Sequence, residues 1–205
     1  MEKTLERKPA GRKAESRRRL LDAARRLFVE HGYHDTRPQD ISKEAGVGHG
    51  TFYLHFEDKQ ACFSAFVEEA REELNEEVAR HTDGAATLDE LIRGTLNGCF
   101  TYAEAHPGVL RAVMADMSVI AGRPETESEE TIMDQWGDGW TESLLEAAND
   151  GLVDRQLHLN TAGHAIPGAI YQAFRNAARR NIPRETVIDS LTTFIVRALQ
   201  PTPSE

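Results

Sequence analysis

The chain has 205 residues, of which 40% are hydrophobic and 28% charged, and its net charge is −10. This composition is typical of a globular protein and excludes a chain that is disordered throughout. No apolar run approaches the length of about 20 residues that crosses a bilayer, and the N-terminus lacks the apolar segment of a secretory signal, so we expect a cytoplasmic protein.

Every long segment has the apolar spacing of an amphipathic helix, and no run of alternating apolar and polar residues predicts a strand. We therefore predict an all-α fold. The first helix is expected from about Ser16 to His31, with Gly32 as its C-terminal stop. One face of this helix is apolar and the other carries arginines, which we expect to be available to phosphate groups.

A short second helix is predicted after Arg37, with Pro38 in its first position, and a third after Gly48. Between them, Gly46 supplies the positive φ that a sharp turn needs, and Val47 fills the angle between the two helices. Three helices in about 45 residues, the last two joined by a tight turn, have the dimensions of a helix-turn-helix motif.

The helices after this motif are longer. One is predicted to run to about His81, and the next opens at Thr87 with Glu90 three residues later, which is the pattern of a capping box. A shorter helix over 110–117 and an acidic loop over 121–130 precede a helix whose apolar residues recur every four positions. These residues are Ile132, Trp136, Trp140 and Leu144.

Two more helices follow. Asn160 is expected to cap a helix that runs to about Asn181, and Pro183 opens the last one. The total is about nine helices, and the sequence does not repeat at the period of a solenoid.

The charge is unevenly distributed along the chain. Residues 1–56 carry 12 Lys and Arg against 8 Asp and Glu, a net charge of +4, whereas residues 57–205 carry 12 against 26, a net charge of −14. A polyanion such as DNA is attracted to the first part and repelled by the second. We therefore predict a helix-turn-helix DNA-binding domain with a basic arm over 1–56, followed by a larger helical domain over 57–205.

The segment from Leu20 to Lys59 carries a series of motifs: Phe-x-x-x-Gly-Tyr at the end of the first helix, Asp-Ile in the second, Ala-Gly-Val in the turn and Thr-Phe-Tyr-x-His-Phe-x-x-Lys after it. In these motifs the segment resembles the DNA-binding domain of the TetR family of transcriptional regulators. The resemblance implies a nine-helix homodimer, in which three helices bind DNA and six bind a ligand and the second subunit.

The family pattern also implies which residues contact DNA. The first residues of the third helix would approach base edges, Tyr53 and His55 a phosphate, and Lys59 the DNA backbone, because a recognition helix enters the major groove with its N-terminal end. Phe52 and Phe56, on the other face, are expected in the core. The predicted DNA-binding residues are Arg37, Gln39, Gly48, His49, Gly50, Thr51, Tyr53, His55 and Lys59.

Two positions depart from the family pattern. Arg37 stands where the family usually has a capping Ser or Thr; it cannot cap the second helix, but it can reach a phosphate. Gly48 stands where the family usually has Ser, so it caps the third helix but offers no hydroxyl group to DNA.

The predicted ligand pocket combines apolar, aromatic and sulfur-containing side chains, which suit a small hydrophobic or aromatic effector. An ordinary hydrophobic core has the same composition and is the alternative. Gly137 and Gly139 lie inside a helix, where each costs about 1 kcal/mol relative to alanine, so we expect the close approach of a ligand or of a partner helix there. The predicted lining residues are Leu96, Cys99, Phe100, Met114, Met117, Trp136, Trp140, Tyr171 and Phe174.

The last two helices are the predicted dimer interface. Small residues on the first of them allow close packing, and an apolar seam on the second completes a four-helix bundle between two subunits. The predicted interface residues are Gly163, Ala169, Ala173, Ala177, Val187, Leu191, Ile195 and Leu199.

The combined prediction is a transcriptional regulator, a repressor released from a palindromic operator when its effector binds; activation instead of repression stays open. Neither Gly-x-Ser-x-Gly, His-Glu-x-x-His nor a phosphate loop occurs, so we expect no enzyme. Cys62 and Cys99 are far apart and the histidines are scattered, so we expect no metal and no cofactor. The alternatives are a helical adaptor for a partner protein and an enzyme, both without a role on DNA.

Overall fold

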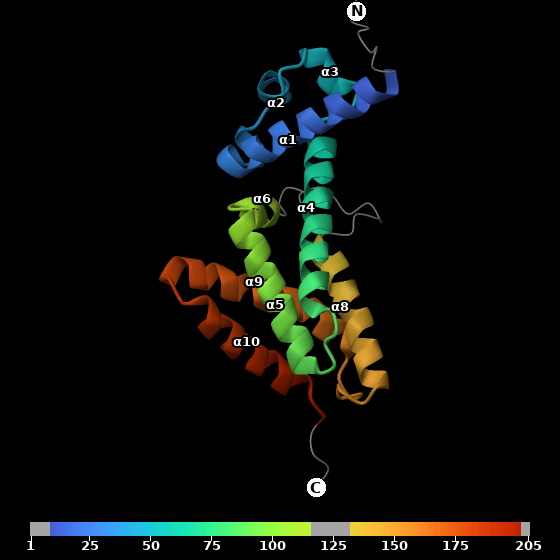
Figure 1. Cartoon of the computed structure of the whole chain (residues 1–205), viewed down its shortest axis with the longest axis vertical. Coiled ribbons are helices and arrows are strands. Elements are labelled where there is room, and N and C mark those ends of the chain that lie inside the picture. The colour runs from blue at the N-terminus through green and yellow to red at the C-terminus, as the bar shows by residue number, and fades with distance from the viewer. Residues whose placement is uncertain (1–8, 116–131, 202–205) are drawn as a thin grey trace, which may run out of the picture. The chain divides into compact units, whose positions relative to one another are not determined.

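The computed structural model describes residues 9–115 and 132–201, and within them it has nine helices and no strand (Figure 1). The helices are α1 (Pro9–Asp35), α2 (Pro38–Glu44), α3 (His49–Tyr53), α4 (Lys59–Thr82), α5 (Leu88–Ala105), α6 (Val109–Ala115), α8 (Ile132–Asn149), α9 (Leu159–Arg180) and α10 (Arg184–Leu199). The prediction of an all-α fold is confirmed. In the described part of the chain, no helix is both long and apolar enough to span a membrane.

The helices belong to two compact units. The first comprises Met1–Glu73 and His106–Asp116, and the second comprises Leu74–Ala105 and Met117–Glu205. The first unit therefore contains α6 in addition to α1, α2 and α3, and the division falls within α4. The predicted domain boundary after residue 56 stays a prediction.

An aromatic cluster forms the core of the first unit. Phe28 of α1 meets Phe63 of α4 edge-on, with 5.1 Å between ring centroids. Phe66 and Tyr33 lie 5.8 Å and 6.0 Å from Phe28. Rings at such distances attract each other in addition to being buried. The apolar face predicted for the first helix thus packs against α4.

Helix α1 extends beyond both predicted ends. It begins at Pro9, because proline suits the first position of a helix. Gly32, with φ of 80°, interrupts the helix without ending it. The hydroxyl group of the buried Thr36 lies 2.8 Å from the carbonyl oxygen of Gly32 and 3.3 Å from that of Leu27, and so holds the last turn in place.

Helix α6 packs on α1. Arg111 donates a hydrogen bond of 3.0 Å to the carbonyl oxygen of Val29. Gly108, with φ of 83°, brings the preceding turn so close that a Cβ atom there would lie 2.8 Å from Cγ1 of Val29. Arg25 of α1 lies 3.1 Å from Nδ1 of His106. These contacts explain why α6 belongs to the first unit.

The second unit contains a close crossing between the end of α4 and α5. A Cβ atom at Gly94 would lie 2.5 Å from the carbonyl oxygen of His81, and one at Gly98 would lie 2.8 Å from Cα of Val78. The backbones therefore touch at this crossing. Around it, α5, α8, α9 and α10 share one apolar core that includes Ile92 and Leu144.

The glycines of α8 have different surroundings. A Cβ atom at Gly137 would lie 2.5 Å from the imidazole ring of His164. A Cβ atom at Gly163 would lie 2.8 Å from the carbonyl oxygen of Gly137. The close approach expected at Gly137 is therefore that of a partner helix, α9. At Gly139 a Cβ atom would have no described atom within 4 Å.

The two predicted caps of the second unit have opposite outcomes. Thr87 and Glu90 form the capping box, since each backbone amide donates to the other side chain, at 3.1 Å and 3.2 Å. The prediction that Asn160 caps the next helix is wrong. Helix α9 begins at Leu159 and its N-cap is His158, two residues before Asn160; Nδ1 of His158 accepts the amide hydrogen of Thr161 at 3.3 Å.

Candidate nucleic-acid interface

Helix α3, the predicted recognition helix, has one buried and one exposed face. Gly46 has φ of 63° in the turn before α3, as that turn requires, and Gly48 is the N-cap in extended conformation. Phe52 is fully buried, whereas Tyr53 is 52% exposed. On the exposed side, the ring of His49 lies edge-on to that of Tyr53 at 5.2 Å.

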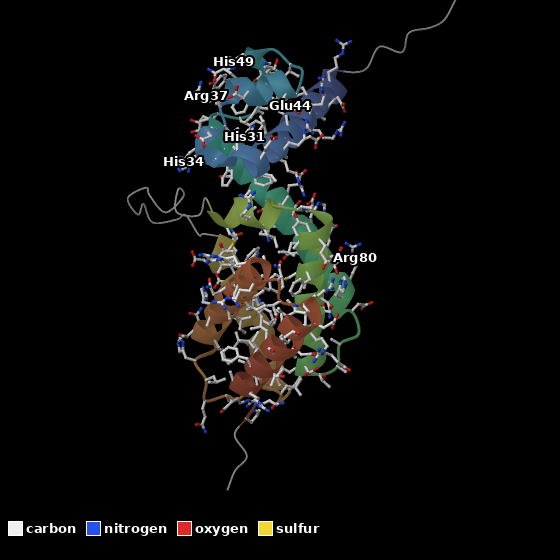
Figure 2. All side chains as sticks on the ribbon, turned by 90° about the vertical axis from the view of Figure 1, so that its left-hand side faces the viewer. His31, His34, Arg37, Glu44, His49 and Arg80 are labelled. Atoms are coloured by element: carbon white, nitrogen blue, oxygen red, sulfur yellow. The ribbon has the colours of Figure 1, made fainter. Side chains whose placement is uncertain are left out.

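Most of the predicted DNA contacts before Tyr53 are accessible. Figure 2 shows His34, Arg37 and His49 along one edge of the first unit. As expected, Arg37 makes no side-chain cap to α2. The structure also exposes Leu54 directly after α3, at 71%, a residue that the sequence analysis did not select and that could contact a thymine methyl group. The exposed predicted residues are Arg37, Gln39, Gly48, His49, Gly50 and Tyr53, and Thr51 is half-buried.

His55 lies against α1. Its Nε2 is 2.7 Å from the hydroxyl oxygen of Ser16, which is also 3.0 Å from the carbonyl oxygen of Lys13. Burial, followed by the charges of Lys13 and Arg17, lowers the pKa of His55 below its usual 6.5. A neutral imidazole is therefore favoured in the free protein, and its contact with a phosphate stays a prediction.

Lys59 is engaged within the protein. Its Nζ donates to the carbonyl oxygen of Tyr33 at 2.7 Å, lies 3.4 Å from that of His34, and is 4.1 Å from the centre of the Tyr33 ring. These carbonyl groups end α1, where the helix dipole favours a cation. The placement favours a role in joining α1 to α4, and a contact of Lys59 with the DNA backbone stays a prediction.

Two arginines of α1 make contacts within the protein although both residues are exposed. Arg19 donates to the carbonyl oxygens of Ala45 and Gly46, and the guanidinium of Arg17 lies 5.3 Å from the ring centre of Phe56. The availability of this face to phosphate stays a prediction at these two positions. Sequence spacing gave no signal for either contact, because the three consecutive arginines are chemically identical.

The structure distributes the predicted ligand residues over both units. Leu96 is fully buried in the core of the second unit, and the rings of Phe100 and Phe174 lie 3.9 Å apart. Met114 lies on α6, in the first unit, and Met117 lies outside the described residues. The other predicted residues are half-buried in the second unit: Cys99, Trp136, Trp140 and Tyr171.

Burial raises the pKa of the thiols of Cys62 and Cys99 to about 12, so both are protonated at neutral pH. Protonated thiols are poor nucleophiles and poor metal ligands. Among the residues that the structure describes, no group of three or more His, Cys, Asp or Glu side chains could hold a metal ion.

The apolar seam predicted on α10 is largely internal. Its four residues have exposed fractions of only 3–8% in a single protomer, because this face of α10 packs into the core with α5. Val187, Leu191, Ile195 and Leu199 thus pack within their own protomer, and their part in a dimer interface stays a prediction. On α9, Gly163 packs on α8 and Ala177 is buried. Ala173 packs against the core, and so does Ala169, which also lines a groove.

That groove has a volume of about 450 Å³ and lies between the start of α9 and the end of α10. Phe194, 63% exposed, is the most prominent residue of its wall. Small side chains of both helices form much of the rest, namely Ala162, Ala165, Ala169 and Ala198.

Comparison with known proteins agrees with this geometry. The family model for bacterial regulatory proteins of the tetR family matches residues 20–66. The transcriptional repressor Rv1474c of Mycobacterium tuberculosis is 26% identical over 166 residues, which cover 78% of this chain and 76% of that protein. A regulator of Bacillus subtilis is 43% identical, but only over 53 residues, and the chain spans 27% of its length.

Solved structures share the fold. The fatty acid degradation regulator FadR from Bacillus halodurans aligns with a TM-score of 0.73 at 19% identity, over 88% of this chain and 94% of that one. RolR, solved in complex with resorcinol, aligns with a TM-score of 0.67 at 19% identity, over 94% and 91%.

The exposed short helix behind a glycine turn defines a helix-turn-helix regulator. Together with the family match, it shows that residues 20–66 form a DNA-binding domain of the type found in the TetR family of transcriptional regulators. This family is not enzymatic, which confirms the prediction that the chain is not an enzyme.

Proposed function

We propose that the protein is a repressor that binds a palindromic operator through α3 and acts in the cytoplasm. The observation that carries the proposal is the division of α3 into two faces. Phe52 anchors the helix in the core, while His49 and Tyr53 form an aromatic pair in solvent. A helix held in this way can enter a major groove without rearranging its own domain.

The operator is proposed to be palindromic because the active form is a two-fold dimer. Recognition helices of such dimers reach half-sites one turn of DNA apart, roughly 34 Å, or multiples of it. The groove between α9 and α10 supports this proposal, since Phe194 stands beside a wall of alanines. A two-fold axis would place the Phe194 ring of each subunit in the groove of the other.

The proposed effector is a small hydrophobic or aromatic molecule that binds the second unit and weakens DNA binding. Nε1 of Trp136 supports a ligand there, because it is buried and has no hydrogen-bond partner among the described residues. Buried donors are normally paired, and an acceptor atom of an effector would pair this one. The complex of RolR with resorcinol shows that the same fold holds a hydroxylated aromatic molecule.

A gel-shift titration with the DNA upstream of the protein's own gene tests the function. We expect a complex that the double variant His49→Ala/Tyr53→Ala weakens at least tenfold, since it removes the exposed pair of α3. Leu145→Ala, at an exposed position of α8, is the matched control and should bind as the wild type does.

Retained operator binding by the double variant would show that α3 does not read DNA. No complex with any upstream fragment at low salt would favour the adaptor hypothesis. In a reporter strain, deletion of the gene should raise transcription from the bound promoter, and a decrease would identify an activator instead.

A further inference from the structure

The turn between α2 and α3 is held by a cation from α1. Arg19 donates through Nη2 to the carbonyl oxygen of Ala45 and, at 3.1 Å, to that of Gly46. Ala45 is the C-cap of α2, and the amides of Ala45 and Gly46 bond back to carbonyl groups within α2. The guanidinium therefore occupies the carbonyl end of α2, where unpaired oxygens and the helix dipole favour positive charge.

The end of this side chain also lies close to Gly46. A Cβ atom at Gly46 would lie 2.8 Å from Nη2 of Arg19, and Gly46 has φ of 63°. Glycine is required at position 46 by this backbone conformation, whereas the flexible end of the Arg19 side chain can shift away from a Cβ atom. Arg19 lies directly on the turn.

The neighbouring arginines have other partners. Arg18 pairs with two carboxylates of its own helix at 3.1 Å and 3.4 Å. Arg17 lies over the ring of Phe56, in the segment that follows α3. Arg17 and Arg19 therefore hold the chain on the two sides of α3, a helix of only five residues that has little stability of its own.

We propose that Arg19 is a positioning residue for operator recognition, which acts through the α2–α3 turn and not on a DNA phosphate. The inference rests on the proposed function. Reading a base edge requires well-aligned hydrogen bonds from the recognition helix, whereas attraction to phosphates gives affinity for any sequence. Loss of Arg19 should therefore reduce affinity for the operator more than affinity for unrelated DNA.

The test compares Arg19→Gln with Arg18→Gln, which removes the same charge from the adjacent position. Fluorescence anisotropy gives the affinities for the operator and for a scrambled duplex of equal length between 50 and 200 mM salt. We expect equal affinities of the two variants for the scrambled duplex. For the operator, Arg19→Gln should bind about 10-fold more weakly than Arg18→Gln, the effect of losing a charge-assisted hydrogen bond.

Two results would overturn the proposal. One is equal operator affinity of the two variants. The other is a parallel loss on both duplexes in Arg19→Gln, with a salt slope reduced by about 0.9, because that pattern identifies a phosphate contact. If Arg19→Gln does not fold, Arg19→Lys takes its place: it keeps the charge but not the planar fork, so it should lower the ratio of operator to scrambled affinity, and an unchanged ratio would contradict the role.

Hydrogen exchange of the DNA-free protein separates this inference from the proposed function. In Arg19→Gln, the amides of Val47 and Thr51 should exchange at least tenfold faster than in Arg18→Gln, while that of Phe66 in α4 is unchanged. Equal exchange would exclude the positioning role even if the wild type binds its operator. A wild type that does not discriminate between the two duplexes, with exchange as expected, would overturn only the proposed function.

Discussion

Gly48 caps α3 without a side chain, which limits the stability of this helix and, in the proposed function, its contact with DNA. It caps α3 with φ of −65° and ψ of 145°, a conformation that any residue adopts, and the nearest atom to a Cβ there would be Oγ1 of Thr51 at 3.8 Å. Gly48→Ser therefore fits without strain. Its hydroxyl group can accept the amide hydrogen of Thr51 and can donate to a phosphate.

We expect Gly48→Ser to raise the free energy of unfolding by a few tenths of a kcal/mol and to increase operator affinity. Urea denaturation and anisotropy titrations measure the two effects. Gly48→Ala is the control, because alanine is a poor N-cap and should lower stability instead. Weaker operator binding by the serine variant would show that the Gly48 backbone, and not a missing hydroxyl group, sets the distance to DNA.

His55 should make the stability of the protein depend on pH. Its pKa in the folded protein is lowered, first by burial and then by Lys13 and Arg17, whereas the unfolded chain takes up the proton near 6.5. Below that pH the unfolded state binds more protons at this site, so stability decreases as the pH falls from about 7 towards the folded pKa.

Replacing His55 by Gln should reduce this decrease. The difference in free energy of unfolding between pH 7.5 and pH 5.5 should be smaller in His55→Gln than in the wild type, when both are measured by urea denaturation. His34→Gln, at an exposed position, serves as the control and should keep the wild-type difference. An identical pH dependence in all three proteins would show that His55 is not coupled to folding.

At the scale of elements, glycines in two helices have opposite roles. At Gly98 of α5 a Cβ atom would lie 2.8 Å from Cα of Val78, and at Gly139 of α8 it would meet nothing within 4 Å. Overpacking costs about 1–3 kcal/mol, while replacing a helical glycine by alanine gains up to about 1 kcal/mol. Replacement by alanine should therefore lower the free energy of unfolding at Gly98 and raise it at Gly139.

Thermal unfolding should accordingly show a lower Tm for Gly98→Ala and a higher one for Gly139→Ala. Each variant is the control of the other, since both introduce the same methyl group inside a helix. A stabilised Gly98→Ala would mean that α4 and α5 separate at no cost. A destabilised Gly139→Ala would point to a ligand or a subunit covering α8.

Helix identities followed from the sequence, and several helix ends did not. Thr87 and Glu90 form the expected capping box because this motif depends only on two residues three positions apart in the sequence. His158 is the N-cap in place of Asn160 because its imidazole nitrogen accepts the amide hydrogen of Thr161, the third residue of the helix. Gly32 interrupts α1 without ending it because Thr36 ties the next turn back, a contact that depends on the folded chain.

At the scale of the whole molecule, the sequence located the short helix α3 behind its glycine turn, but it did not separate the core-facing residues of α10 from the exposed ones. The motifs located α3 because Gly46 supplies the positive φ of the turn before it and Phe52 supplies its buried side chain. On α10, apolar residues that face the core of their own protomer and apolar residues that face a second subunit have the same spacing. Burial alone separates Leu191, 8% exposed, from Phe194, 63% exposed.

Phe194→Asp should therefore dissociate the proposed dimer. Burying a phenylalanine contributes about 1.5–3 kcal/mol to binding, and a two-fold dimer contains two such rings. The dimer dissociation constant should therefore rise by a factor of at least about 100. The introduced carboxylates would also be desolvated in the alanine-lined grooves. Light scattering coupled to gel filtration at micromolar concentration should give the mass of one chain for the variant and of two for the wild type.

Operator binding tests whether the proposed dimer is the form that binds the full palindrome. A monomer engages one half-site, so Phe194→Asp should lose most of its affinity for the full palindrome yet bind an isolated half-site as weakly as the wild type does. Leu145→Asp, at a position of α8 that is 49% exposed, introduces the same charge and should stay dimeric. If Leu145→Asp separates the subunits and Phe194→Asp does not, the second copy packs against α8, and the groove between α9 and α10 has another occupant.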